Sequence, residues 1–137
     1  MSPDLFAFTD ESKNAADAWS KKLIGAAIEV HRNLGPGLLE NPYEECLCHE
    51  LDLQGIPYKR QHPVTINYKG ITVDAAYRID ILVADLVVVE LKSVLKMEPV
   101  FEAQLLTYLR LYQRWLGLLM NFNVPVLKDG IQRRVLG

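Results

Sequence analysis

The sequence predicts a single mixed α/β domain, and three observations lead to that prediction. Its 137 residues match the usual size of one domain. Half of the residues are hydrophobic and 23% are charged, which is typical of a folded domain and excludes a disordered protein. Hydrophobic residues recur at helical spacing in some segments and at alternate positions in others, and the two kinds of segment are intermixed along the chain.

Two helices are expected in the first third of the chain, after a tail. Residues 1–14 show no sustained period and are predicted to lie outside the domain, which we expect to cover residues 15–137. Apolar residues recur at helical spacing from 15 to 34, up to a Gly-Pro-Gly sequence that ends a helix. A second helix is expected to begin near Asn41, a residue type that caps helices, with Glu44 in the position of a capping-box acid.

The apolar spacing then changes from helical to alternating, which predicts strands. The predicted strands are residues 62–68, 71–77, 79–84, 86–91, 117–122 and 131–136. A third helix is expected between the fourth and fifth of these strands, over residues 98–115, because its apolar residues return to helical spacing. The resulting order is two helices, four strands, one helix and two strands.

Charge narrows the classes of function. The net charge of −2, from 15 Lys and Arg against 17 Asp and Glu, excludes a protein that binds nucleic acid through bulk charge alone. Residues 1–52 hold 4 basic and 10 acidic side chains, whereas residues 110–137 hold 5 and 1, so the basic end is a candidate lining for a phosphate path. No signal-like segment opens the chain and no apolar run is long enough to span a bilayer, so we expect a cytoplasmic protein.

The segment 78–92 places two acids inside an otherwise apolar hairpin. With a turn centred on Asp85, Asp80 lies directly opposite Glu90. Lys92 then projects from the same face as both acids. Two like charges at such a position destabilise a sheet unless a cation lies between them. Mg²⁺ is the natural candidate, because it binds a few carboxylate oxygens and keeps waters that a substrate can displace.

An ordinary solvated ion pair is the alternative interpretation of these charges, and spacing alone does not separate the two. The consecutive valines at 87–89 favour a strand buried on both faces, where charges are functional or paired. Gln104 and Tyr108 are four apart on the third predicted helix, either as a surface hydrogen-bonded pair or as part of the same site. Glu40, beside the second predicted helix, has the alternative role of complementing the helix dipole.

A set of short motifs in this sequence resembles the GxxExxY family. The signature is the sequence GLLENPY at residues 37–43. The other matching segments are residues 24–32, 90–92, 103–109 and 117–122. The family is placed in the PD-(D/E)XK nuclease-like superfamily, whose members are similar to restriction endonucleases and RecB-type nuclease domains. The resemblance covers nearly the whole chain from Ala15 onward and leaves only the tail outside it.

The resemblance implies a restriction-endonuclease-like α/β fold, in which a mixed central β-sheet is flanked by helices. The residues that it assigns to the metal are Asp80, Glu90 and, from a helix, Glu40, and in a metal-dependent mechanism the carbonyl of Leu91 is a further expected ligand. The residues that it assigns to catalysis are Asp80, Glu90, the lysine Lys92, and Gln104 with Tyr108 as a Q-x-x-x-Y element. Two residues depart from the usual pattern: Ile79 rather than proline precedes the aspartate, and Pro42 lies inside the signature.

The function that the resemblance implies is hydrolysis of phosphodiester bonds in DNA or RNA, with Mg²⁺ or Mn²⁺ as cofactor and nucleic acid as partner. The alternative is a non-catalytic nucleic-acid- or protein-binding module that retains the nuclease fold. The small size and the lack of a dedicated DNA-binding element motivate this alternative. Because many nucleases of this superfamily pair to cut two strands, the resemblance also leaves a homodimer open.

Overall fold

A five-stranded mixed sheet forms the centre of the protein in a computed structural model, which describes residues 8–137. The elements are α1 (Asp10–Leu34), α2 (Glu40–Gln54), β1 (Tyr58–Tyr68), β2 (Ile71–Val83), β3 (Val87–Lys92), α3 (Pro99–Tyr112), β4 (Leu116–Asn121), the 3₁₀ helix η2 (Leu127–Gly130) and β5 (Ile131–Val135). The strands lie in chain order, β1-β2-β3-β4-β5. The pair β3–β4 is parallel and the other neighbours are antiparallel.

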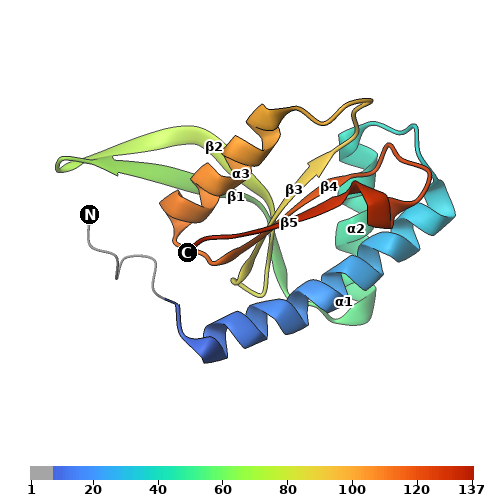
Figure 1. Cartoon of the computed structure of the whole chain (residues 1–137), viewed down its shortest axis with the longest axis horizontal. Helices are drawn as coiled ribbons and strands as arrows, with labels where there is room; N and C mark the ends of the chain where they lie inside the picture. The colour runs from blue at the N-terminus through green and yellow to red at the C-terminus, as the bar shows by residue number, and fades with distance from the viewer. Residues whose placement is uncertain (1–7) are drawn as a thin grey trace.

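The helices cover both faces of this sheet, so the protein has three layers (Figure 1). Helices α1 and α2 pack on one face, over Val87, Val89 and Leu91 of β3. Helix α3 packs on the other face, over Val88 of β3, and Leu105 and Leu109 are its fully buried side chains. Strand β3 is therefore buried on both faces, as the run of valines predicts, and the restriction-endonuclease-like arrangement of a mixed sheet between helices is confirmed.

The parallel pair at the centre explains the position of α3. Parallel strands cannot be joined by a tight turn, because the chain has to return to the same end of the sheet. Helix α3 makes this return between β3 and β4, and it crosses the face that carries the even-numbered residues of β3. The side chains of Glu90 and Lys92 are thus on the α3 side of the sheet.

The structure has five strands where the sequence predicted six. The predicted strands 71–77 and 79–84 are one continuous strand, β2, which pairs with β1 at both of its ends, with a shift of register between Val64 and Ile66. Beyond the core, the β1–β2 hairpin projects from the domain (Figure 1), and its residues Ile71, Val73 and Tyr77 are exposed. Because these residues are exposed, burial does not shape the pattern of apolar and polar side chains in this part of the hairpin. The sequence pattern therefore does not reveal that the two predicted strands are one.

The ends of the helices also differ from the prediction. Helix α1 begins at Asp10, with Thr9 as its N-cap, so the end of the predicted tail is helical, and residues 1–7 lie outside the described residues. Helix α2 begins at Glu40, next to the predicted start near Asn41, but the N-cap is Leu39 and no side chain caps this helix. Glu44 is consequently not a capping-box acid. Within the described residues, no helix combines the length and the hydropathy needed to cross a membrane.

Candidate active site

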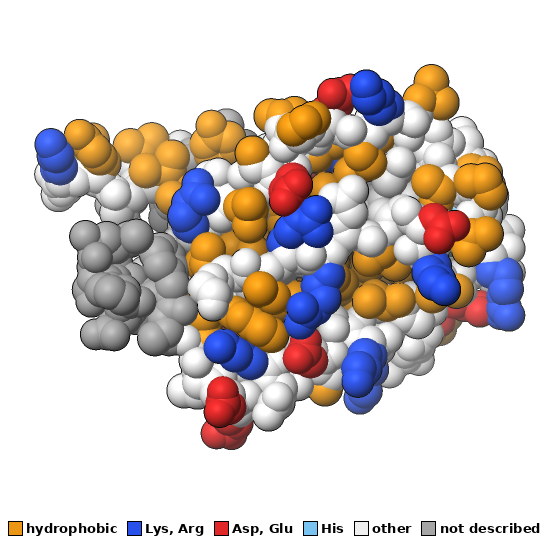
Figure 2. All heavy atoms as spheres, viewed as in Figure 1, with side chains coloured by type: hydrophobic (Ala, Val, Ile, Leu, Met, Phe, Trp, Pro, Cys, Tyr) orange, Lys and Arg blue, Asp and Glu red, His pale blue; other side chains and the backbone are white. Residues whose placement is uncertain are grey.

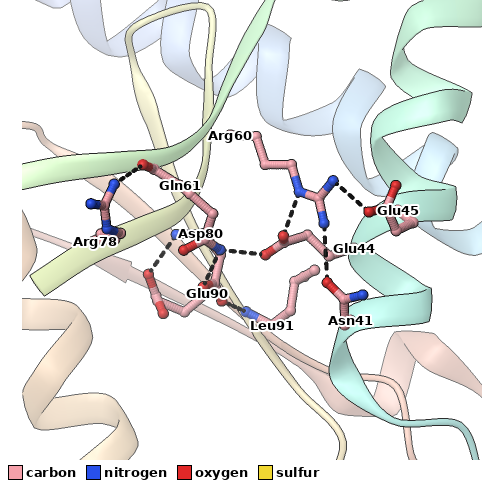
Figure 3. Close-up of polar contacts among 9 residues, drawn as sticks. All are labelled: Asn41, Glu44, Glu45, Arg60, Gln61, Arg78, Asp80, Glu90 and Leu91. Atoms are coloured by element: carbon pink, nitrogen blue, oxygen red, sulfur yellow. Dashed lines mark hydrogen bonds and ion pairs between the residues drawn. The ribbon is translucent and has the colours of Figure 1, made fainter.

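Asp80 of β2 and Glu90 of β3 lie beside each other where the ladder between these strands ends. The last pair of that ladder is Ile81 with Val89, which is the predicted register. Just beyond it, the N–H of Asp80 donates to Oε1 of Glu90 at 3.2 Å (Figure 3). The N–H of Leu91 in turn donates to Oδ2 of Asp80 at 2.9 Å. Each acid therefore accepts a backbone N–H of the opposite strand, which fixes both carboxyl groups to the hairpin.

Burial raises the proton affinity of the Glu90 carboxyl. Glu90 is only 5% exposed. Burial first, and then the negative charge of Asp80, raise the pKa of Glu90 to about 9, against a smaller opposing effect of Lys92. At neutral pH the Glu90 carboxyl therefore keeps its proton when no cation faces it. A divalent cation that binds there has to displace that proton.

Lys92 lies two residues after Glu90, on the same side of the sheet. Its ammonium group is 4.5 Å from the centre of the Phe101 ring at the start of α3, which is a cation–π contact. The lysine is partly buried and close enough to Glu90 to lower its pKa. This contact holds a positive charge beside the acid pair without neutralising either carboxylate in an ion pair.

Gln104 and Tyr108 of α3 form the contact that their spacing predicts. The amide nitrogen of Gln104 donates to the Tyr108 hydroxyl at 2.9 Å. Tyr108 is only 3% exposed and Gln104 is partly buried, so the pair lies at the edge of the α3 core rather than fully on the surface. Burial first, and then the charge of Glu90, raise the pKa of the Tyr108 hydroxyl. The hydroxyl therefore lies within the electrostatic reach of the acid pair and remains a neutral hydrogen-bonding group.

Glu44 of α2 is linked to the acid pair, and the sequence analysis did not single it out as a site residue. It is 7% exposed. Its Oε1 accepts from Nε2 of Gln61 at 2.8 Å, and the same nitrogen lies 3.3 Å from Oδ1 of Asp80 (Figure 3). Its Oε2 accepts from Nε of Arg60 at 2.5 Å. The one sequence signal for this acid is its spacing of four from Glu40, which puts both residues on the same face of a helix.

Glu40 occupies a different environment from Glu44. It is the first residue of α2 and is exposed. In the part of the chain that the structure describes, three or more potential His, Cys, Asp or Glu ligands do not come together in one group. The structure thus brings Asp80 and Glu90 together and places Glu40 at the helix terminus, outside their hydrogen bonds.

Tyr43, the tyrosine of the GxxExxY-like signature, is a structural residue of the core. Its ring stacks on Phe122 at 4.6 Å between ring centres and is fully buried. Its hydroxyl donates to the carbonyl of Gly35 at 2.5 Å and accepts the N–H of Leu38 at 3.2 Å. This tyrosine therefore fastens the loop between α1 and α2, which leads directly into Glu40.

The basic residues after position 109 are largely paired with acids. The ion pairs are Arg114 with Asp85 at 3.0 Å, Arg133 with Asp17 at 2.5 Å and Arg134 with Glu102 at 2.7 Å. On the face shown in Figure 2, basic side chains are interspersed with acidic and apolar ones. These three arginines are therefore engaged within the fold, which weakens the expectation that this end of the chain lines a phosphate path.

The chain belongs to the PD-(D/E)XK nuclease superfamily. The family model described by that name matches residues 17–134, which is nearly the whole of the described chain. The match confirms the superfamily that the motifs imply, while the narrower GxxExxY assignment remains a resemblance. Searches of curated proteins and of solved structures returned no match.

Proposed function

We propose that the protein is a metal-dependent nuclease that hydrolyses phosphodiester bonds of DNA or RNA at a site formed by Asp80, Glu90 and Lys92. The observation that carries this proposal is the position of two acids at the end of the β2–β3 ladder, where each carboxyl group accepts a backbone N–H of the other strand and one of the two is buried, in a fold of the nuclease superfamily. Without a cation, the burial of this pair keeps a proton on Glu90, and a cation can take the place of that proton. Membership of the nuclease superfamily supports nuclease activity as the role of this acid pair.

The donor set fits a hard divalent cation, because carboxylate oxygens are the ligands that Mg²⁺ and Mn²⁺ prefer. Asp80 and Glu90 would hold the cation, and the Leu91 carbonyl and Glu40 are the further ligands that we propose. When bound, such a cation lowers the pKa of a coordinated water and polarises the scissile phosphate. Glu40 is exposed at the start of α2, outside the hydrogen bonds of the acid pair, so its part in cation binding rests on the resemblance alone.

The other proposed catalytic residues act on the phosphate and on the lysine. Lys92 would leave the Phe101 ring and donate to the phosphate, where it stabilises negative charge in the transition state. Gln104 and Tyr108 would position the backbone of the substrate or the lysine, since their paired side chains lie on the α3 face that covers Glu90. A neutral Tyr108 can donate a hydrogen bond there at physiological pH.

Cleavage assays test this proposal. Single- and double-stranded DNA and RNA, each linear and circular, are incubated with the protein in Mg²⁺, Mn²⁺, Ca²⁺ or EDTA. We expect cleavage of at least one substrate in Mg²⁺ or Mn²⁺ and none in EDTA. Glu90→Gln and Lys92→Met should each abolish it. Asp74→Asn is the matched control, because Asp74 is an exposed acid of the same strand as Asp80.

Equal activity in the Glu90→Gln variant and the wild type would contradict the proposed site. The circular substrates distinguish an endonuclease from an exonuclease, since an enzyme that requires free ends leaves circular nucleic acid intact.

A second candidate function is a non-catalytic nucleic-acid- or protein-binding module that retains the fold. The position of Glu40 favours it, because only two carboxylates come together in the described residues. Calorimetric titration with Mn²⁺, with and without an oligonucleotide, separates the two functions. Micromolar binding that Glu90→Gln removes supports the nuclease, and undetectable binding in both conditions supports the module.

A further inference from the structure

Gln61 adopts an unusual backbone conformation in the middle of β1. Its φ is 51°, in the left-handed region that residues with a Cβ rarely adopt. The ladder to β2 passes from the pair Arg60–Ile81 to the pair His62–Ile79, and Gln61 lies between these two pairs. Strained residues of this kind persist only where the surrounding contacts hold them, and they cluster at functional sites.

The side-chain amide of Gln61 is shared between two acids. Its nitrogen lies 2.8 Å from Oε1 of Glu44 and 3.3 Å from Oδ1 of Asp80. Ionised carboxylates only accept hydrogen bonds, and an amide nitrogen carries two hydrogens, so one N–H faces each acid. The backbone carbonyl of Gln61 in turn accepts from Arg78 at 3.3 Å. Both ends of the residue are therefore held in place (Figure 3).

Among the described residues, neither cation of this network, Arg60 or Arg78, forms an ion pair with Asp80. Arg60 binds Glu44 at 2.5 Å and Glu45 at 2.8 Å. Gln61, which is neutral, makes the contact to Asp80. A lysine or arginine at position 61 would orient Asp80 equally well but would neutralise it and compete with a metal ion. A neutral donor orients the carboxylate and leaves its charge available.

We propose that Gln61 is a positioning residue for Asp80: its strained backbone aims a neutral amide, anchored on Glu44 and Arg60, at Oδ1 of the aspartate and fixes that carboxylate for metal binding. The metal-binding part rests on the proposed function. The orientation of Asp80 is a property of the metal-free protein.

The substitution Gln61→Gly tests this role, and the chain supplies a matched control. Gln113, the C-cap of α3, has a φ of 55°, so Gln113→Gly makes the same chemical change at a similar positive φ. Glycine relieves the left-handed strain at both positions. Only the first substitution removes an amide that contacts Asp80. A second variant, Gln61→Asn, keeps a residue that tolerates this conformation but shortens the side chain by one methylene.

Two readouts follow each variant. The first is the hydrogen-exchange rate of the Leu91 amide in the metal-free protein, because this N–H donates to Asp80 and reports its orientation. The exchange rate of the Val88 amide, in the interior of the same strand, corrects for any change in global stability. The second is the dissociation constant for Mn²⁺ by calorimetry.

We expect Gln61→Gly and Gln61→Asn to speed exchange at Leu91 relative to Val88 by about 10-fold, and to weaken Mn²⁺ binding by about 10-fold or more, as outer-shell changes do. Gln113→Gly should change neither. Wild-type values at both readouts in the Gln61 variants would overturn the inference. Faster exchange at Leu91 in a protein whose wild type binds no Mn²⁺ would confirm the link to Asp80 and contradict the proposed function instead.

Discussion

The carboxyl group of Glu90 accepts the backbone N–H of Asp80 at 3.2 Å, while the charge of Asp80 adds to the effect of burial on the pKa of Glu90. The same hairpin thus supplies a hydrogen bond that holds the glutamate and a field that keeps it protonated. The protonation of Glu90 is consequently coupled both to folding and to any cation that binds the pair.

The metal-free protein should become less stable as pH rises. The Glu90 carboxyl has an ordinary pKa of 4.5 in the unfolded chain and about 9 in the folded one. Between these values the folded protein holds a proton that the unfolded chain has released, so stability present at low pH is lost as pH rises toward 9. Urea unfolding in EDTA between about pH 5 and pH 9 measures this slope. Glu90→Gln should reduce it, and an unchanged slope would assign it to other groups.

Cation binding should release a proton. Because the pKa of Glu90 is about 9 in the metal-free protein, the carboxyl is protonated at pH 7 and has to lose its proton to become a ligand. Calorimetric titration with Mn²⁺ in buffers of different ionisation enthalpy measures the number of protons released per bound ion. We expect about one. Values near zero would mean that Glu90 is already ionised or is not a ligand.

Gly130 should not tolerate a side chain. A Cβ at this position would lie 2.2 Å from the backbone carbonyl oxygen of Asn121, because η2 packs closely against the end of β4. Gly130→Ala is expected to cost about 1–3 kcal/mol in the free energy of unfolding. Gly25→Ala, on the exposed side of α1 with open space around it, should instead be neutral or stabilise by up to about 1 kcal/mol. Chemical denaturation of both variants makes the comparison.

The hydroxyl of Tyr43 should contribute to stability and to the placement of Glu40. Tyr43→Phe removes two hydrogen bonds in the loop between α1 and α2 but keeps the ring that stacks on Phe122. We expect a loss of about 1–2 kcal/mol in the free energy of unfolding, because the Leu38 N–H loses its acceptor. Tyr68→Phe, at the exposed tip of the β1–β2 hairpin, is the control and should change stability little. Equal effects in the two variants would contradict this role.

The sequence predicted the part of the site that depends on local geometry. The turn at Asp85 fixes the register of β2 against β3, so the opposition of Asp80 and Glu90 follows from ten residues of sequence. The pairing of Gln104 with Tyr108 follows equally from the four-residue period of one helix. In both cases a single element or hairpin determines which side chains meet.

The contacts of Glu44 could not be predicted in this way. Glu44 meets Arg60 and Gln61 only after α2 folds back against β1, and the predicted strand began at His62, after both residues. The left-handed conformation of Gln61 is set by these tertiary contacts and contradicts the intrinsic preference of glutamine. Sequence periodicity carries no information on either feature.

The hydrogen bond from Leu91 to Asp80 means that a side chain does the work of a backbone carbonyl in this hairpin. One carboxylate oxygen of Asp80 thus takes part in the hydrogen bonding of the sheet, and Gln61 orients the other oxygen. Replacing Asp80 by alanine therefore removes an acid and a rung of the sheet together, so an inactive Asp80→Ala protein would not distinguish a broken site from a frayed strand. Asparagine keeps an oxygen for the Leu91 N–H but gives up the acceptor that faces Gln61, so Asp80→Asn removes the charge and the Gln61 contact while it keeps the rung of the sheet.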